Sequence, residues 1–269
     1  MSNKITLPLE TEFEILEYYL RDGDSMLDAG RKVGTSEYMV NQVLNKYNAK
    51  LPEYLARRSC TLNEDAFDKL NKKCKYFMGL LFSDGSIKTP KGNKAQALSL
   101  GLIDKESIES LRLFLGSDHK IHHDQLSQKN PNWRDQYQLT ITSDKLCNRL
   151  RELGKYTDFI HPTLAMSSDF WRGYCDGNGS MGIWGKGEPM PEIQFDGKYE
   201  WLYQLWQFCN PVVGGNAIPR RYKTKNSARY SLAGKKAIKI IQILYGNDPV
   251  ISMRRKQLSA NKILEKHYA

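Results

Sequence analysis

The sequence has few cysteines and no long apolar run. Its cysteines form no Cys-x-x-Cys pair and no set with zinc-site spacing, a pattern typical of reduced thiols, most of them in a core. No stretch is apolar enough over enough residues to span a bilayer, and the N-terminal residues lack the apolar core of a signal peptide. These absences argue against a disulfide framework and a membrane protein, and they predict a cytoplasmic location. The five cysteines are Cys60, Cys74, Cys147, Cys175 and Cys209.

Acidic residues are also in the minority. The 269-residue chain has 40 Lys and Arg against 30 Asp and Glu, a net charge of +10. Residues 1–60 contain eight basic and nine acidic side chains, so the whole excess of positive charge belongs to residues 61–269. Positive charge of this size attracts polyanions such as nucleic acids. The length allows one large domain or two to three small ones.

Residues 12–48 have the pattern of three short helices. Apolar positions recur at helical spacing in residues 13–20 and 37–46. Asp24 or Ser25 is a suitable cap for the second helix, and Ser36 for the third. Gly34 is placed for the tight turn of a helix-turn-helix. We therefore predict a helix-turn-helix DNA-binding domain over residues 1–50, followed by a linker over residues 51–63.

The third helix would present polar side chains that suit base edges in the major groove. The segment has a slightly negative charge, and a helical hairpin that only packs or contacts protein is the alternative interpretation. The candidate DNA-reading residues of this helix are Tyr38, Asn41 and Gln42.

Two similar stretches lie about ninety residues apart. Residues 76–87 read YFMGLLFSDGSI, and residues 170–181 read FWRGYCDGNGSM. Each is an apolar helix with a central glycine, and each runs into a turn that contains Gly-Ser. The residue before that turn is Asp84 in the first copy and Asn178 in the second.

The same order of elements follows each stretch. Alternating strands, a helix, two more strands and a closing helix are predicted after both copies. An internal duplication of this kind indicates two similar subdomains related by a pseudo-twofold axis. We predict an α+β fold with two αββαββα subdomains, over residues 64–163 and 164–269.

Small residues occur one turn apart in both repeated helices. Gly79 and Ser83 make a smooth strip on the first helix, and Gly173 and Gly177 do so on the second, so the two backbones can cross almost in contact. Residues 84 and 178 would then lie together at two helix C-termini, where partial negative charge favours a cation. A single Asp-Gly is usually a plain turn, but two copies favour a divalent metal site that activates water for phosphodiester hydrolysis.

Residues 70–269 resemble the LAGLIDADG homing endonucleases in the form with both motifs on one chain. The resemblance includes Lys155, seven residues before Pro162, and a second lysine site matched by Lys256. It implies a monomer that cuts double-stranded DNA at a long asymmetric site with Mg²⁺ or another divalent cation. It implies catalytic roles for Asp84, Asn178, Lys155 and Lys256, with metal held at Asp84, Asn178, Gly85 and Gly179. Solvated surface is the alternative for the lysines.

The resemblance further implies that each sheet curves over the DNA, with alternate strand residues in the major groove. Any one of these side chains could equally be an ordinary exposed strand residue. A metal site at His119, His122 and His123 is a weaker possibility. The DNA-contact candidates are Lys88, Lys94, Gln96, Ser99, Lys120, His122, Gln138 and Thr140 in the first half, and Trp184, Glu192, Gln194, Arg220, Lys223 and Arg229 in the second.

Two positions depart from the family pattern. Phe82 replaces the first acid of one motif, a capping position. Asn178 replaces a metal-binding Asp, which removes a negative charge from a cation site. A degenerate enzyme, an enzyme that nicks one strand and a chain mutated to trap uncut DNA all remain open. So does a catalytically inactive DNA- or RNA-binding protein, either a transcriptional regulator or an intron maturase.

Overall fold

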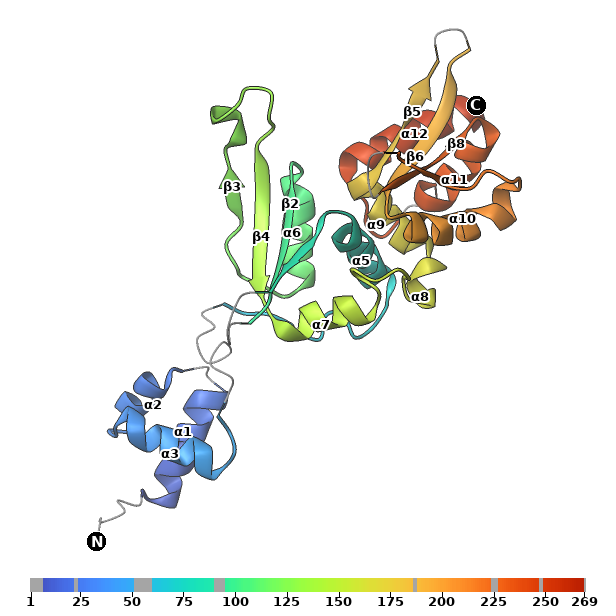
Figure 1. Cartoon of the computed structure of the whole chain (residues 1–269). Helices are drawn as coiled ribbons and strands as arrows, with labels where there is room; N and C mark the ends of the chain where they lie inside the picture. The colour runs from blue at the N-terminus through green and yellow to red at the C-terminus, as the bar shows by residue number, and fades with distance from the viewer. Residues whose placement is uncertain are drawn as a thin grey trace. The chain divides into compact units, whose positions relative to one another are not determined.

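The computed structural model describes residues 7–21, 24–50, 60–89, 95–185, 188–223, 227–246 and 249–268. The chain divides into two compact units, Met1–Thr61 and Leu62–Ala269 (Figure 1). Within the described residues no helix is both long enough and apolar enough to cross a membrane. The candidate Lys94 and most of the predicted linker, residues 51–59, lie outside the described residues.

The described residues of the first unit form three helices, as expected. They are α1 (Leu9–Leu20), α2 (Met26–Lys32) and α3 (Glu37–Lys46). The Ser25 side chain caps α2 and the Ser36 side chain caps α3, each accepting a hydrogen bond from a backbone N–H of the first turn. Gly34 has φ of +72°, the left-handed conformation that the turn between α2 and α3 requires. The small core consists of Ile15, Tyr19, Ala29, Val40, Val43 and Leu44.

The second unit contains the two repeats in the predicted order. The first repeat contains α5 (Lys72–Asp84), β1 (Ser86–Lys88), β2 (Ala97–Leu102), α6 (Lys105–Phe114), β3 (His122–Asp124), a 3₁₀ turn (Leu126–Gln128), β4 (Gln136–Thr142) and α7 (Asp144–Glu152). The second contains α8 (Pro162–Ala165), α9 (Ser168–Asn178), β5 (Gly179–Trp184), β6 (Met190–Gly197), α10 (Tyr199–Val213), β7 (Arg220–Arg221), β8 (Ala228–Ala233), α11 (Lys235–Tyr245) and α12 (Arg254–Tyr268).

The two sheets have the same topology, which confirms the duplication. The strand orders are β1-β2-β4-β3 and β5-β6-β8-β7, with every pair antiparallel. Burial alternates along the strands, most regularly in β8, because one face packs on helices and the other stays polar. The pairing registers of the central strands also correspond. Gly101 of β2 lies opposite Gln138 of β4, and at the equivalent place in the second sheet Asp196 of β6 lies opposite Arg229 of β8.

Some predicted boundaries were wrong. The sequence predicts a short helix over residues 64–72, but residues 64–68 form turns and α5 begins only at Lys72, where the Asn71 side chain caps it. Strand β3 begins at His122, so Lys120 precedes it. The strand predicted over residues 217–223 shortens to Arg220–Arg221, which leaves Lys223 in the following turn.

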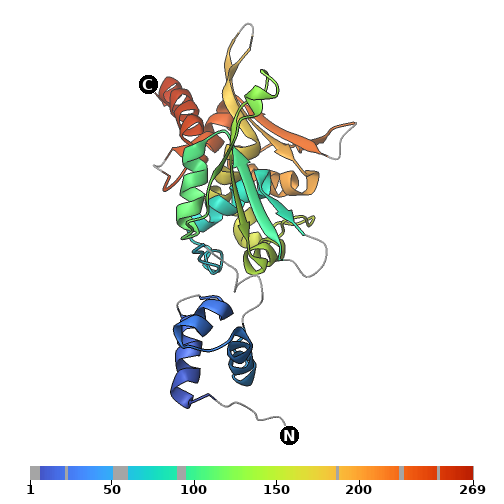
Figure 2. The same ribbon diagram turned by 90° about the vertical axis from the view of Figure 1, so that its left-hand side faces the viewer.

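Helices α5 and α9 cross between the two sheets (Figure 1). A Cβ atom on Gly79 would overlap the carbonyl oxygen of Phe170, and one on Gly173 would overlap that of Tyr76. The two backbones therefore touch at the predicted glycine strip. On another side of the unit, Arg255 at the start of α12 pairs with Asp104 just before α6 at 2.9 Å, and Figure 2 shows both helices along the same edge.

We expect Gly79→Ala to destabilise the second unit by about 3 kcal/mol or more, because the added methyl group meets backbone that cannot turn aside. Urea unfolding would measure the change. The matched control is Gly101→Ala, whose Cβ would lie 3.6 Å from its nearest neighbour, the flexible Gln136 side chain. A similar free energy of unfolding for both variants would contradict the close crossing.

Candidate active site

The ends of α5 and α9 bring Asp84 and Asn178 together. A Cβ atom on Gly177 would overlap both Oδ2 of Asp84 and Oγ of Ser83, so the tip of α9 lies directly against the tip of α5. Nδ2 of Asn178 donates a hydrogen bond to the Ser83 carbonyl oxygen at 3.4 Å. Both Asp84 and Asn178 are exposed, so their oxygens are open to a ligand.

Lys155 is buried at the end of α5. Its Nζ donates hydrogen bonds to the carbonyl oxygens of Leu81 at 2.8 Å and Phe82 at 2.9 Å, and the residue is only 4% exposed. Solvated surface is therefore the wrong alternative for this residue. Burial lowers the pKa of Lys155 to about 8, although the nearby charge of Asp84 opposes the shift.

Lys256 has the corresponding place at the end of α9. It is also buried, and its Nζ donates a hydrogen bond to the Gly179 carbonyl oxygen, so this carbonyl already has a cationic partner. Burial lowers the pKa of Lys256, and the positive charge of Arg255 adds to the effect. The other glycine at the turn, Gly85, donates its N–H to the Leu81 carbonyl at 3.0 Å. Each lysine thus anchors one helix end, Lys155 through the last turn of α5 and Lys256 through the residue that follows α9.

Asp84 lies in an asymmetric electrostatic setting. Although the residue as a whole is exposed, partial loss of solvent around its carboxyl group raises the pKa of Asp84, while the Ser83 hydrogen bond and the positive charges of Lys155, Lys256 and Arg255 oppose that rise. The carboxylate can accept a cation, and the cationic side chains around it can attract a phosphate. The tip of α9 offers only the neutral amide of Asn178 at the same place.

Asp176 is a buried acid beside the candidate site that the sequence did not single out. Its fully buried carboxylate accepts hydrogen bonds from Tyr76 Oη at 2.7 Å, Tyr245 Oη at 2.7 Å and the Met253 N–H at 2.6 Å. Burial raises its pKa. Met253 immediately precedes α12, so Asp176 fixes the start of the helix that carries Lys256.

Phe82 occupies the position of Asp176 in the first repeat. Its ring is buried and packs 5.3 Å from the ring of Phe170 and 5.3 Å from that of Trp201. The first repeat therefore uses apolar contacts where the second uses a carboxylate. The signal in the sequence was the acid two residues before Asn178, which has no counterpart two residues before Asp84.

The buried Lys155 makes stability depend on pH. Its pKa falls from an ordinary 10.5 to about 8 in the folded chain, so the unfolded chain binds more protons between these values and stability rises with pH there. We expect the wild type to gain up to about 3 kcal/mol relative to Lys155→Met as the pH increases from 8 to 10.5. Urea unfolding at several pH values would measure this difference, and a constant difference would contradict a lowered pKa.

In the first sheet, Ser99, Gln138 and Thr140 share the polar face. Oγ of Ser99 lies 3.0 Å from Oγ1 of Thr140 and accepts a hydrogen bond from Nε2 of Gln138 at 2.9 Å. Ser99 is buried, whereas Lys88, Lys120 and His122 are exposed. Gln96 precedes β2 and donates hydrogen bonds to Asp144 at 3.2 Å and Asn148 at 2.9 Å, which ties its side chain to α7 instead of the polar face.

In the second sheet, Glu192, Gln194 and Arg229 share the polar face. Nε2 of Gln194 donates to Glu192 Oε1 at 2.7 Å. Arg229 is opposite Asp196 in β6 and opposite Arg220 in β7. Trp184, Arg220 and Lys223 are exposed at the edges of this sheet.

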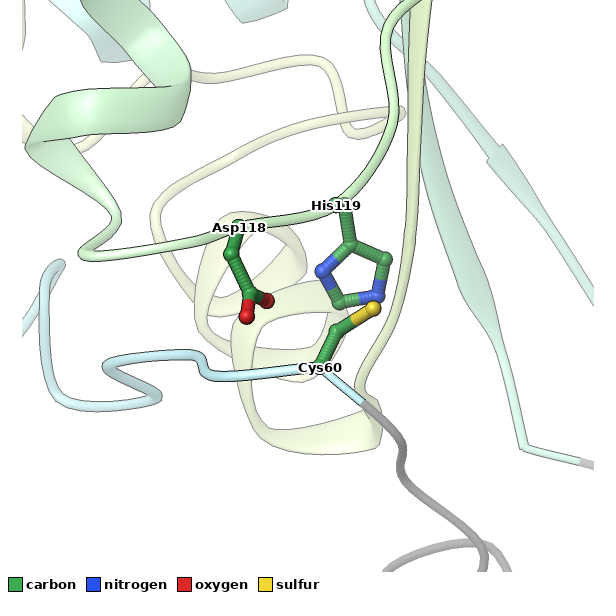
Figure 3. A group of neighbouring side chains, drawn as sticks. All are labelled: Cys60, Asp118 and His119. Carbon is green, nitrogen blue, oxygen red and sulfur yellow. The ribbon is translucent and has the colours of Figure 1, made fainter.

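His119, His122 and His123 do not come together as a metal site. Nδ1 of His119 lies 2.7 Å from Ser117 Oγ, whereas His123 stacks on Tyr137 and lies 3.7 Å from Asp135. Figure 3 shows His119 beside Asp118 on the segment after α6. Across the described ranges, no group of three potential metal ligands includes His122 or His123.

Comparison with known proteins gives a match at the level of the fold. No protein-family model and no curated protein sequence matches the chain. Among solved structures, the LAGLIDADG homing endonuclease I-LtrWI bound to target DNA matches with a TM-score of 0.51 and 10% identity, over 77% of this chain and 92% of that one. I-GzeII in complex with its DNA target gives 0.50 and 11%, over 74% and 93%.

A third match is I-SmaMI bound to uncleaved DNA in the presence of calcium ions, with a TM-score of 0.51 and 12% identity, over 74% of this chain and 92% of that one. In the chain itself, two four-stranded antiparallel sheets flank the crossed helices α5 and α9. The chain has the fold of the single-chain LAGLIDADG homing endonucleases.

Proposed function

We propose that the chain is a site-specific DNA endonuclease of homing type that acts as a monomer on a long asymmetric duplex. The observation that supports this most directly is the meeting of Asp84 and Asn178 at two duplicated helix ends, each anchored by a buried lysine. One chain supplies both helix ends, so it needs no second copy to complete the site. The proposal places the cut at this junction.

The residues present fit a divalent cation such as Mg²⁺. Asp84 supplies a carboxylate and Asn178 an amide oxygen, both hard oxygen ligands at the negative ends of helix dipoles. A bound cation would supply charge stabilisation and an activated water for phosphodiester hydrolysis. Lys155 and Lys256 would hold positive charge beside the scissile phosphates while keeping the two helix ends in register.

The N-terminal unit would extend the target. On α3, Tyr38 and Gln42 are exposed and offer polar groups to a major groove, whereas Asn41 is half-buried and its side-chain oxygen is covered. The excess positive charge of residues 61–269 would supply most of the attraction to phosphate.

Asn178 favours a second function for the chain, binding of nucleic acid without cleavage. An amide in place of the second acid weakens one of the two metal positions, so the same scaffold could bind nucleic acid without cutting it. A transcriptional regulator or an intron maturase would use the protein in this way.

Incubation with a pool of randomised duplexes, with and without Mg²⁺, separates the two functions. An endonuclease produces new DNA ends only when Mg²⁺ is present. Denaturing gels of end-labelled strands then reveal whether one strand or both are cut. The binding protein gives only shifted bands. Affinity should fall steeply with salt in both cases, and a flat salt response would contradict both.

A further inference from the structure

Arg229 lies on the polar face of the second sheet, in β8, and the carboxylate of Asp196 in the neighbouring strand β6 holds its side chain. Nε of Arg229 donates to Oδ1 of Asp196 and Nη2 donates to Oδ2, each at 3.0 Å. Oη of Tyr222 donates to the same Oδ1 at 2.6 Å. We call these three side chains, Arg229, Asp196 and Tyr222, the Arg229 cluster.

The cluster leaves one edge of the guanidinium available. A guanidinium has a side edge, Nε with Nη2, and an end edge, Nη1 with Nη2, and Asp196 occupies the side edge. The Arg229 side chain is 44% exposed, and its neighbours in β8, Ala228 and Tyr230, point into the core. Arg229 is therefore fixed on the polar face before any ligand binds, which reduces the conformational entropy lost on binding.

Guanine matches the available edge. Its O6 and N7 atoms are adjacent acceptors in the major groove, and a bidentate arginine is their commonest partner. The negative charge of Asp196 opposes a simple phosphate contact, because it would repel the DNA backbone. We propose that the Arg229 cluster reads one guanine of the target, with Arg229 as the reading residue and Asp196 as its positioning residue. This inference rests on the proposed function.

The first half of the fold offers a different reader at the equivalent position. Gln138 lies opposite Gly101 in the register that places Arg229 opposite Asp196, so this position has no carboxylate. Gln138 instead donates to Ser99 Oγ at 2.9 Å. The two halves therefore present unlike side chains at symmetric places, and the guanine preference belongs to one half-site only.

Binding selections from a randomised duplex pool, with Ca²⁺ in place of Mg²⁺, test the inference with the full chain. We expect Asp196→Asn to reduce the preference for guanine at one position by about 10-fold. The same substitution should tighten binding to unrelated duplexes, because it removes a negative charge from the DNA-facing surface. These opposite effects on specificity and general affinity are the signature of a positioning residue.

Two further variants at Arg229 and a matched control at Gln138 sharpen the test. Arg229→Ala and Arg229→Lys should both lose the same guanine preference, although the lysine keeps the charge and therefore the salt dependence of binding. Gln138→Ala should leave that position intact and alter one in the other half-site.

If the Asp196 and Arg229 variants select the same sites as the wild type, or weaken binding to all duplexes equally, the inference is overturned while the proposed function stands. If the wild type enriches no duplex at all, both fall.

Discussion

Asp84→Asn is expected to reduce cleavage of both DNA strands by about 10³-fold, because it removes the exposed carboxylate at the end of α5. In the proposed function this carboxylate would hold a divalent cation, and loss of its charge would cost several kcal/mol of transition-state stabilisation. The measurement is single-turnover cleavage of a selected target in Mg²⁺. Should the wild type cut too slowly to follow, the substitution is made in the Asn178→Asp background.

Binding provides the control for this variant. Asp84 is exposed at the helix tip, so its replacement should leave the free energy of unfolding within about 0.5 kcal/mol of wild type. Target affinity should stay the same or rise slightly, since a negative charge near phosphate is lost. Full cleavage by Asp84→Asn would place the chemistry elsewhere in the molecule.

Asn178→Asp is expected to raise cleavage by about 100-fold or more, and chiefly on one strand. The substitution restores a negative charge at the tip of α9 and gives a cation two carboxylates in place of one. No other change at this helix end is needed, because buried Lys256 anchors the end of α9 through the Gly179 carbonyl and buried Lys155 anchors the end of α5 through the Leu81 carbonyl. Strand-specific end labelling in Mg²⁺ would measure the effect.

The conservative control for the second variant is Asn178→Ser, which keeps a small polar group without a charge. It should bind the target as the wild type does and gain no cleavage. An Asn178→Asp protein that binds a target and leaves both strands intact in Mg²⁺ would count against the nuclease and in favour of the binding protein.

The binding-only alternative makes different demands on the same residues. Lys155 and Lys256 are hydrogen-bonded to carbonyl groups beside the Asp84–Asn178 junction, and burial lowers the pKa of each. Both functions can use these lysines to hold the helix ends, whereas only the endonuclease needs the Asp84 carboxylate. Cleavage by the Asp84 and Asn178 variants therefore separates the two functions.

The sequence by itself determined the parts of the protein that depend on local chemistry. The glycines of the repeated helices predicted the close crossing, since only residues without a side chain allow two backbones to touch. Strand alternation and turn residues predicted both αββαββα repeats. The meeting of Asp84 and Asn178 followed from the same geometry, because each residue ends its helix directly after the crossing.

Only the tertiary structure decided which polar residues have partners. Burial of Lys155, the three hydrogen bonds to Asp176 and the pairing of Arg229 with Asp196 all join segments 33 to 100 residues apart, so no local pattern reports them. Gln96 was predicted to face DNA because its partners are also distant in sequence. Its side chain is hydrogen-bonded to Asp144 and Asn148 of α7. Side-chain partners depend on how the repeats pack against each other. The periodicity of helices and strands depends only on residues that are near one another in the sequence.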